Sequence, residues 1–179
     1  MATPPDFSSG AVLTAAQMNS VGLWLVKTQT VGTAVSSVAV TGAFSTDYEH
    51  YKIQYSGTTS IGGGNVINIQ LGAVTTGYYA TMQYASYTGV GGTVVADNNA
   101  TSWTHCAGAV GNQVILDADI YNPFKTQISS ISTNIYTDAG NAGKKSGYNS
   151  NTTSVTGFTL LVASGTITGG TIRVYGYRK

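Results

Sequence analysis

Apolar and polar residues alternate along much of the chain from residue 23 onward. The alternation is clean in five segments, which cover residues 51–55, 67–71, 114–120, 158–163 and 172–175. Successive side chains of a β-strand point to opposite faces of a sheet, so each segment presents one apolar face to a core. Weaker alternation covers residues 23–28, 35–40, 78–85, 93–96, 102–106 and 126–136. The pattern therefore predicts many short strands, and a change of parity between Ile128 and Ile131 predicts a β-bulge within the last segment.

Glycine-rich and polar segments separate these strands. Residues 57–64, 89–92 and 169–170 are rich in glycine, which is typical of turns. The longest polar stretch, residues 138–154, lacks the strand pattern and is predicted to be an exposed loop. Nothing after residue 22 has helical periodicity, and no repeat of fixed period occurs. We therefore expect an all-β fold, an antiparallel β-sandwich of jelly-roll-like form.

The first 22 residues follow a different pattern. Residues 1–13 include two prolines together with serine and glycine, and they are predicted to form an extended arm. Thr14 and Gln17 have the spacing of a capping box, which predicts a short helix over residues 15–21 that Gly22 ends. A helix of one or two turns is not stable alone, so it needs a surface to lie on. The chain is therefore divided into a docking or oligomerisation segment, residues 1–22, and a β-sandwich domain, residues 23–179.

Composition narrows the classes of protein that remain. Of 179 residues only 8% are charged, the net charge is +1, and 42% are hydrophobic. This balance excludes a chain disordered by its charge and does not favour a nucleic-acid partner. No stretch approaches the roughly 20 apolar residues of a membrane span, and the start lacks the features of a signal peptide. We expect synthesis in a cytoplasm and a weakly charged surface that suits permanent contact with neighbouring proteins.

The residues able to carry out catalysis are few. His105 and Cys106 are adjacent, so on a strand their side chains point to opposite faces and do not form a nucleophile–base pair. Asp117 and Asp119 share a strand face and could in principle serve glycoside hydrolysis or bind a cation, but the remaining ligands of a calcium loop are missing. Residues 143–146 resemble part of a phosphate-binding loop, yet Asp138 stands where its first glycine is required. We therefore expect no enzyme, no metal and no cofactor.

Aromatic residues gather in the middle third of the chain. Tyrosine and tryptophan at a rim can stack on sugar rings or contact a partner protein. The alternative is cross-strand packing within the sheet. The residues of this possible glycan or partner surface are Tyr78, Tyr79, Tyr84, Tyr87 and Trp103.

Three segments resemble structural proteins of tailed bacteriophages. Residues 7–22 resemble an N-terminal arm followed by a Leu-Thr-Ala…Asn helix, residues 120–126 resemble a strand-end Asn-Pro turn with Lys-Thr, and residues 170–178 resemble a closing strand. The resemblance implies a small virion protein of the head-decoration (cement) or minor tail (fibre) type, usually a homotrimer. It would lie on the capsid or tail surface and contact the major capsid or tail proteins.

Taken together, these observations favour a structural role without chemistry. The residues expected to contact the partner are Phe7, Leu13, Met18, Leu23 and Trp24. A host receptor- or glycan-binding fibre or adaptor module, which would use the aromatic surface or residues 138–154, is the alternative. A hydrolase built on Asp117 and Asp119 is a third hypothesis.

Overall fold

The computed structural model describes residues 10, 12, 22–62, 64–89, 91–137 and 140–177. These residues form β-strands joined by turns and loops. In chain order the strands are β1 (Leu23–Thr30), β2 (Ser37–Val40), β3 (His50–Thr59), β4 (Asn65–Leu71), β5 (Tyr78–Ser86), β6 (Gly92–Ala100), β7 (Trp103–Val110), β8 (Gln113–Tyr121), β9 (Ser129–Thr137), β10 (Asn141–Asn149), β11 (Phe158–Val162) and β12 (Ile167–Tyr177).

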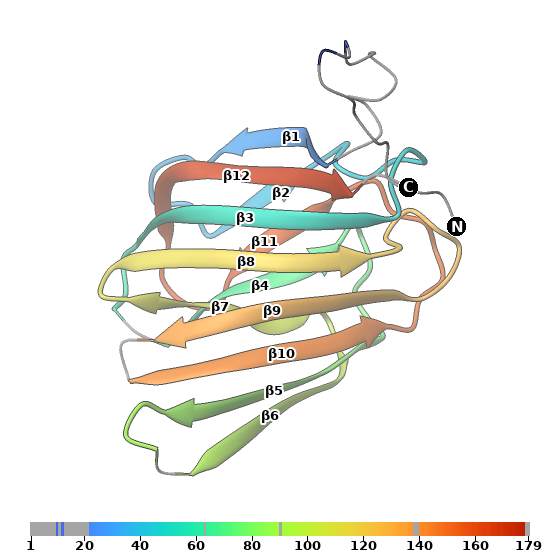
Figure 1. Cartoon of the computed structure of the whole chain (residues 1–179). Coiled ribbons are helices and arrows are strands. Elements are labelled where there is room, and N and C mark those ends of the chain that lie inside the picture. The colour runs from blue at the N-terminus through green and yellow to red at the C-terminus, as the bar shows by residue number, and fades with distance from the viewer. Residues whose placement is uncertain are drawn as a thin grey trace.

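The strands lie in two layers, and neighbouring strands are antiparallel throughout. The large sheet has the order β1-β12-β3-β8-β9-β10-β5-β6, and the small sheet behind it has the order β2-β11-β4-β7 (Figure 1). Strand β7 connects the layers, because its first part pairs with β4 and its last two residues, Ala109 and Val110, pair with β8. The expected antiparallel β-sandwich is therefore confirmed.

The core between the sheets is built from the inward positions of the alternating segments. Tyr51 and Ile53 of β3 face it from the large sheet, and Ile67 and Ile69 of β4 face it from the small sheet, all fully buried. Trp103 is the largest buried side chain, and its ring contacts that of Tyr78 edge to face at 5.1 Å. A single cluster of buried hydrophobic residues joins both layers. Burial of one face of each strand explains why a period of two was readable in the sequence.

All five clean segments and all six weaker ones lie on or overlap strands, but three finer predictions are wrong. Residues 169–170 are not a turn between strands, because they lie within β12 at a shift of its register with β3. Residues 138–154 are not an exposed loop, because Asn141–Asn149 form β10, which pairs along its whole length with β9 and β5. The predicted bulge is also absent from β9, since its register with β10 runs unbroken from Ser129 to Thr137 and Ile128 precedes the strand. The proposed arm and the helix over residues 15–21 lie outside the described residues, apart from residues 10 and 12.

The composition of β10 explains why its pattern was missed. The strand reads Asn-Ala-Gly-Lys-Lys-Ser-Gly-Tyr-Asn, and most of these residues are rare in strands. Gly143 and Gly147 lie against the backbone of β5, where an added Cβ would collide with atoms of Gln83 and Ala80. Glycine in a strand marks such a close approach of a neighbouring backbone. Hydrogen bonding on both sides therefore outweighs a poor local propensity.

Candidate functional site

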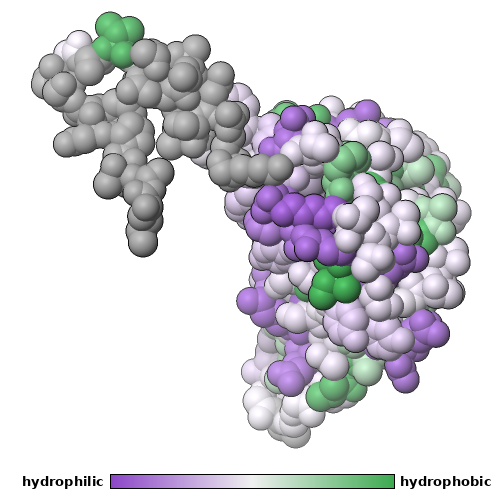
Figure 2. Space-filling model, turned by 90° about the vertical axis from the view of Figure 1, so that its right-hand side faces the viewer, coloured by the Kyte–Doolittle hydropathy of each residue, from purple (hydrophilic) through white to green (hydrophobic). Residues whose placement is uncertain are grey.

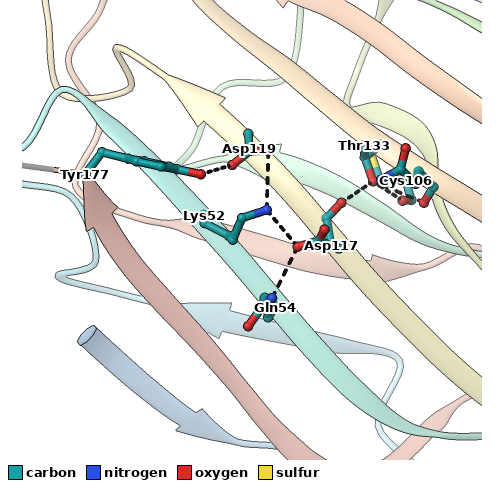
Figure 3. A network of polar contacts seen from close by, with 8 residues as sticks. Lys52, Gln54, Cys106, Asp117, Asp119, Thr133 and Tyr177 are labelled. Carbon is teal, nitrogen blue, oxygen red and sulfur yellow. Dashed lines mark hydrogen bonds and ion pairs between the residues drawn. The ribbon is translucent and has the colours of Figure 1, made fainter. Parts of the chain in front are cut away.

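The two carboxylates singled out in the sequence lie on the outer face of the large sheet, within a network of polar contacts (Figure 3). Lys52 of β3 places its Nζ 2.9 Å from Asp117 Oδ1 and 3.4 Å from Asp119 Oδ2. The hydroxyl of Tyr177 donates a hydrogen bond of 2.8 Å to Asp119, and the amide of Gln54 donates one of 3.4 Å to Asp117. The strand register places these groups together, because Lys52 lies opposite Asp119 and Gln54 opposite Asp117.

This arrangement engages both carboxylates. Burial alone would lower the pKa of Lys52, but its hydrogen bond to Asp117 and the charges of both aspartates outweigh burial and raise it. The lysine therefore stays protonated and neutralises part of the charge that a dyad or a cation site would need. Within the described residues no group of three or more histidine, cysteine and carboxylate side chains lies close enough to hold a metal ion.

His105 and Cys106 occupy different environments. The backbone of His105 is left-handed, with φ of 52°, and its N–H donates to Asn68 Oδ1 at 3.1 Å. Cys106 is completely buried, and its thiol donates to the carbonyl oxygen of Trp103 at 3.2 Å. Burial raises the pKa of this thiol to about 12, so it remains protonated and unreactive near neutral pH. Cys106 is thus a small residue of the hydrophobic core.

A buried polar cluster, which the sequence analysis did not find, lies at the β5–β6 end of the sandwich. Lys145 of β10 and Asp97 of β6 form an ion pair of 2.6 Å, and their side chains are 0% and 3% exposed. Thr104 of β7 donates to Asp97 through its hydroxyl at 2.5 Å and through its N–H at 3.1 Å. The Nδ1 of His105 lies 2.7 Å from the Thr104 hydroxyl. We call Lys145, Asp97, Thr104 and His105 the buried polar cluster.

Two adjacent lysines in the sequence could have indicated this cluster. Two consecutive lysines on a strand must face opposite sides, so one of Lys144 and Lys145 has to enter the core once residues 141–149 are recognised as a strand. The prediction of a loop removed that constraint. A buried lysine requires a carboxylate partner, and Asp97 of β6 provides it.

A cleft of about 180 Å³ adjoins the buried polar cluster at His105. Met82, Tyr84, Val95 and Ile135 give it largely apolar walls, and Thr137 also lines it. The Thr137 hydroxyl is buried and has no hydrogen-bond partner within the described structure. Burial lowers the pKa of the His105 imidazole, and the charge of Lys145 lowers it further against the smaller opposing effect of Asp97. His105 is therefore neutral near pH 7.

The predicted aromatic surface does not exist as one surface. Tyr78 and Trp103 are core residues with no exposed area, so their assignment to a glycan or partner surface is wrong. Tyr84 lines the cleft, whereas Tyr79 stacks on Tyr148 of the neighbouring strand at 5.3 Å. Of the five residues, Tyr87 alone is strongly exposed. Alternation places residues 78 and 84 on the inner face of β5 and residue 79 on the outer face.

Among the large apolar side chains that are exposed, two groups lie together elsewhere on the described structure. On β1, Leu23, Trp24 and Leu25 are 42%, 37% and 53% exposed, and among the described strands β1 pairs with β12 alone. A second group lines a shallow groove where β7, β8 and β9 meet, formed with Tyr87, Val110, Ile115 and Tyr136. Of the predicted partner contacts, Leu23 and Trp24 are thus exposed, whereas Phe7, Leu13 and Met18 lie outside the described residues.

One face of the molecule is weakly polar. Figure 2 shows a face on which pale residues of intermediate hydropathy predominate, interrupted by small separate hydrophilic and hydrophobic patches.

In the part of the chain that the structure describes, no helix is long and apolar enough to cross a membrane. Comparison with protein-family models, curated proteins and solved structures finds no match to this chain.

Proposed function

We propose that the chain is a structural subunit on the surface of a tailed-bacteriophage particle, of the capsid-decoration or minor-tail type. In this proposal residues 1–22 and β1 dock it onto capsid or tail proteins and onto copies of itself, and no chemistry is required. The observation that carries the proposal is β1, an edge strand with Leu23, Trp24 and Leu25 exposed, which continues directly from the N-terminal segment. An open edge strand with apolar side chains is a ready surface for another chain.

Other features support the same proposal. Because only 8% of the residues of the chain are charged, its surface has little electrostatic protection against association, which suits a protein held among neighbours. The engagement of Asp117 and Asp119 by Lys52 disfavours the hydrolase hypothesis. Many weak contacts, repeated over a homo-oligomer such as a trimer and over a symmetric particle, would supply the binding strength.

The proposal includes a jelly-roll-like arrangement of the strands and a docking segment at the N-terminus. Strand β3 pairs with β12 in the large sheet, β4 with β11 in the small sheet, and β5 with β10 again in the large sheet. Nested pairing of early with late strands, alternating between layers, supports the jelly-roll-like description, with β8 and β9 inserted between β3 and β10. We retain the extended arm and the short capped helix over residues 15–21 as the docking segment.

Deletion of residues 1–22 should abolish binding to particles while the sandwich still folds. The measurement adds full-length and truncated protein to particles from which the chain has been removed genetically, and then quantifies bound protein after sedimentation. The substitution Trp24→Ala should weaken binding in the same assay, whereas Tyr148→Ala, at an exposed position on β10, is the matched control and should bind normally. Circular dichroism reports folding. Normal binding of the truncated protein would contradict the proposed docking segment.

A host-glycan-binding fibre or adaptor module is the second candidate. The groove beside Tyr87 and Tyr136 favours it, because exposed tyrosine rings can stack on sugar rings. A glycan array probed with the isolated protein and with Tyr136→Ala separates the two candidates. Glycan binding that depends on Tyr136 would support the glycan role. No binding to any glycan on the array, combined with full binding to particles, would support the structural role.

A further inference from the structure

The buried polar cluster places an amine and a carboxyl group in contact inside the sandwich. We propose that the side chains of Lys145 and Asp97 condense after folding into an amide bond that joins β10 covalently to β6. This inference is independent of the proposed function, because it rests on one pair of side chains and their surroundings. It assigns a self-catalysed modification to a pair that would otherwise be a simple ion pair.

The position and the burial of the Lys145 and Asp97 side chains both favour bond formation. The Lys145 nitrogen lies 2.6 Å from Asp97 Oδ2, and both side chains are withdrawn from solvent. They stand on strands separated by β5, in adjacent rows of the sheet, since Lys145 pairs with Met82 while Asp97 pairs with Ala80. Fixing two reactants in this way replaces a bimolecular encounter with a unimolecular step, which raises the effective concentration by many orders of magnitude.

Proton transfer within the pair has to come before the C–N bond forms. A buried ion pair loses the hydration of both charges, and that penalty falls if the ammonium group transfers a proton to the carboxylate. The charges of Lys145 and Asp97 both act on the pKa of the Cys106 thiol, which is completely buried. The pair therefore lies next to the apolar core. Proton transfer from Nζ to Oδ2 leaves an amine with a free electron pair beside an uncharged carboxylic acid.

The condensation then balances without any other reactant. The Nζ electron pair attacks Cγ of Asp97, forming the C–N bond, and the C=O electrons move onto Oδ1. The nitrogen gives up a proton to the Oδ2 hydroxyl, which leaves as water when the C–O bond breaks and the C=O bond at Oδ1 re-forms. One amine and one carboxylic acid become one amide and one water molecule, with no change of oxidation state.

Thr104 and His105 are positioned to assist this step. The Thr104 hydroxyl, 2.5 Å from Oδ1, donates to the oxygen that becomes negative in the tetrahedral intermediate. Because its proton points at Asp97, the same hydroxyl accepts from the Nδ1–H of His105 at 2.7 Å. His105 also lines the cleft, which connects this chain of donors to the exterior. Thr104 is therefore a stabilising group for the oxyanion, and His105 is a positioning residue for Thr104.

The bond would secure the end of the large sheet. Among the described strands β6 pairs with β5 alone, and a link from Asp97 to Lys145 would hold the β5–β6 hairpin against β10. Like other internal cross-links, this bond would restrict the conformations of the unfolded chain. It would also prevent the hairpin from separating from β10. The expected consequence is a hairpin that stays attached under denaturing conditions.

Intact-mass spectrometry of the purified, denatured full-length protein tests the proposal. We expect a mass lower than that calculated for the same N-terminus by one water molecule. Trypsin should then leave the bond after Lys145 uncut and release a branched peptide that joins residues 53–125 to residues 145–173. The variant Lys145→Arg should show its full calculated mass, and the matched control Lys144→Arg should show the loss of water. The full calculated mass for the unsubstituted protein would overturn the proposal.

Substitution of Thr104 tests the assisting group separately. Freshly refolded Thr104→Val should lose water at least tenfold more slowly than the unsubstituted protein, and Thr104→Ser, which keeps the hydroxyl, should restore the rate. The readout is the fraction of protein with the lower mass as a function of time. Equal rates for the valine and serine variants would remove Thr104 from the mechanism.

Discussion

Replacing Lys145 with methionine should lower the free energy of unfolding by about 3–5 kcal/mol. The substitution leaves Asp97 buried with no cation, and removing one partner of a buried ion pair carries a penalty of that order. Urea unfolding of the unsubstituted and substituted proteins, followed by far-ultraviolet circular dichroism, measures the difference. A covalent link between the two side chains would give a loss of the same sign, because the variant lacks it too.

The neighbouring lysine supplies the control for this result. Lys144 is exposed on the outer face of β10, and Lys144→Met should change the free energy of unfolding by less than about 0.5 kcal/mol. The double variant Asp97→Leu with Lys145→Met should recover part of the loss, because no charge remains buried. A Lys145→Met variant as stable as Lys144→Met would show that the described burial of Lys145 is wrong.

Replacing Trp103 with alanine should cost about 3–5 kcal/mol, the usual range for removing a buried tryptophan. Its ring fills the centre of the core beside Tyr78, and its Nε1–H donates to the carbonyl oxygen of Tyr148 at 3.3 Å. The variant therefore leaves a cavity and loses this hydrogen bond. Chemical denaturation monitored by circular dichroism measures the effect.

The second tryptophan separates stability from association. Trp24 lies on the exposed edge strand, so Trp24→Ala should leave the free energy of unfolding within about 0.5 kcal/mol of the unsubstituted value. The same variant should weaken self-association, measured by light scattering during gel filtration. If Trp103→Ala were the neutral variant and Trp24→Ala the destabilised one, the assignment of core and docking surface would be reversed.

The strands could be predicted from the sequence because most of them have one buried face. Residues 114–120 show this well, since Val114, Leu116, Ala118 and Ile120 are all buried while Asp117 and Asp119 face outward. Strand β10 could not be predicted in this way. Its inner face carries Gly143, Lys145 and Gly147, which satisfy a close backbone contact and a buried carboxylate rather than an apolar core.

The candidate sites were harder to predict than the strands. The outward position of Asp117 and Asp119 followed from alternation alone, but their ion pairs with Lys52 depend on the register between β3 and β8. The aromatic residues were grouped by their nearness in the sequence, which says nothing about faces. Tyr78 of β5 and Trp103 of β7 belong to the core because their rings pack against each other between the two sheets, and that packing is a tertiary property.

Quantification of the chain in purified phage particles tests the proposed function most directly. Particles from the genome that encodes the chain would be purified by density gradient, and the number of copies per particle determined by quantitative mass spectrometry. The proposal predicts a fixed number of copies per particle, with hundreds indicating the head or tail-tube surface and a handful a baseplate or fibre adaptor. Absence from intact particles, with the protein confined to the soluble fraction of the lysed host, would contradict a virion role.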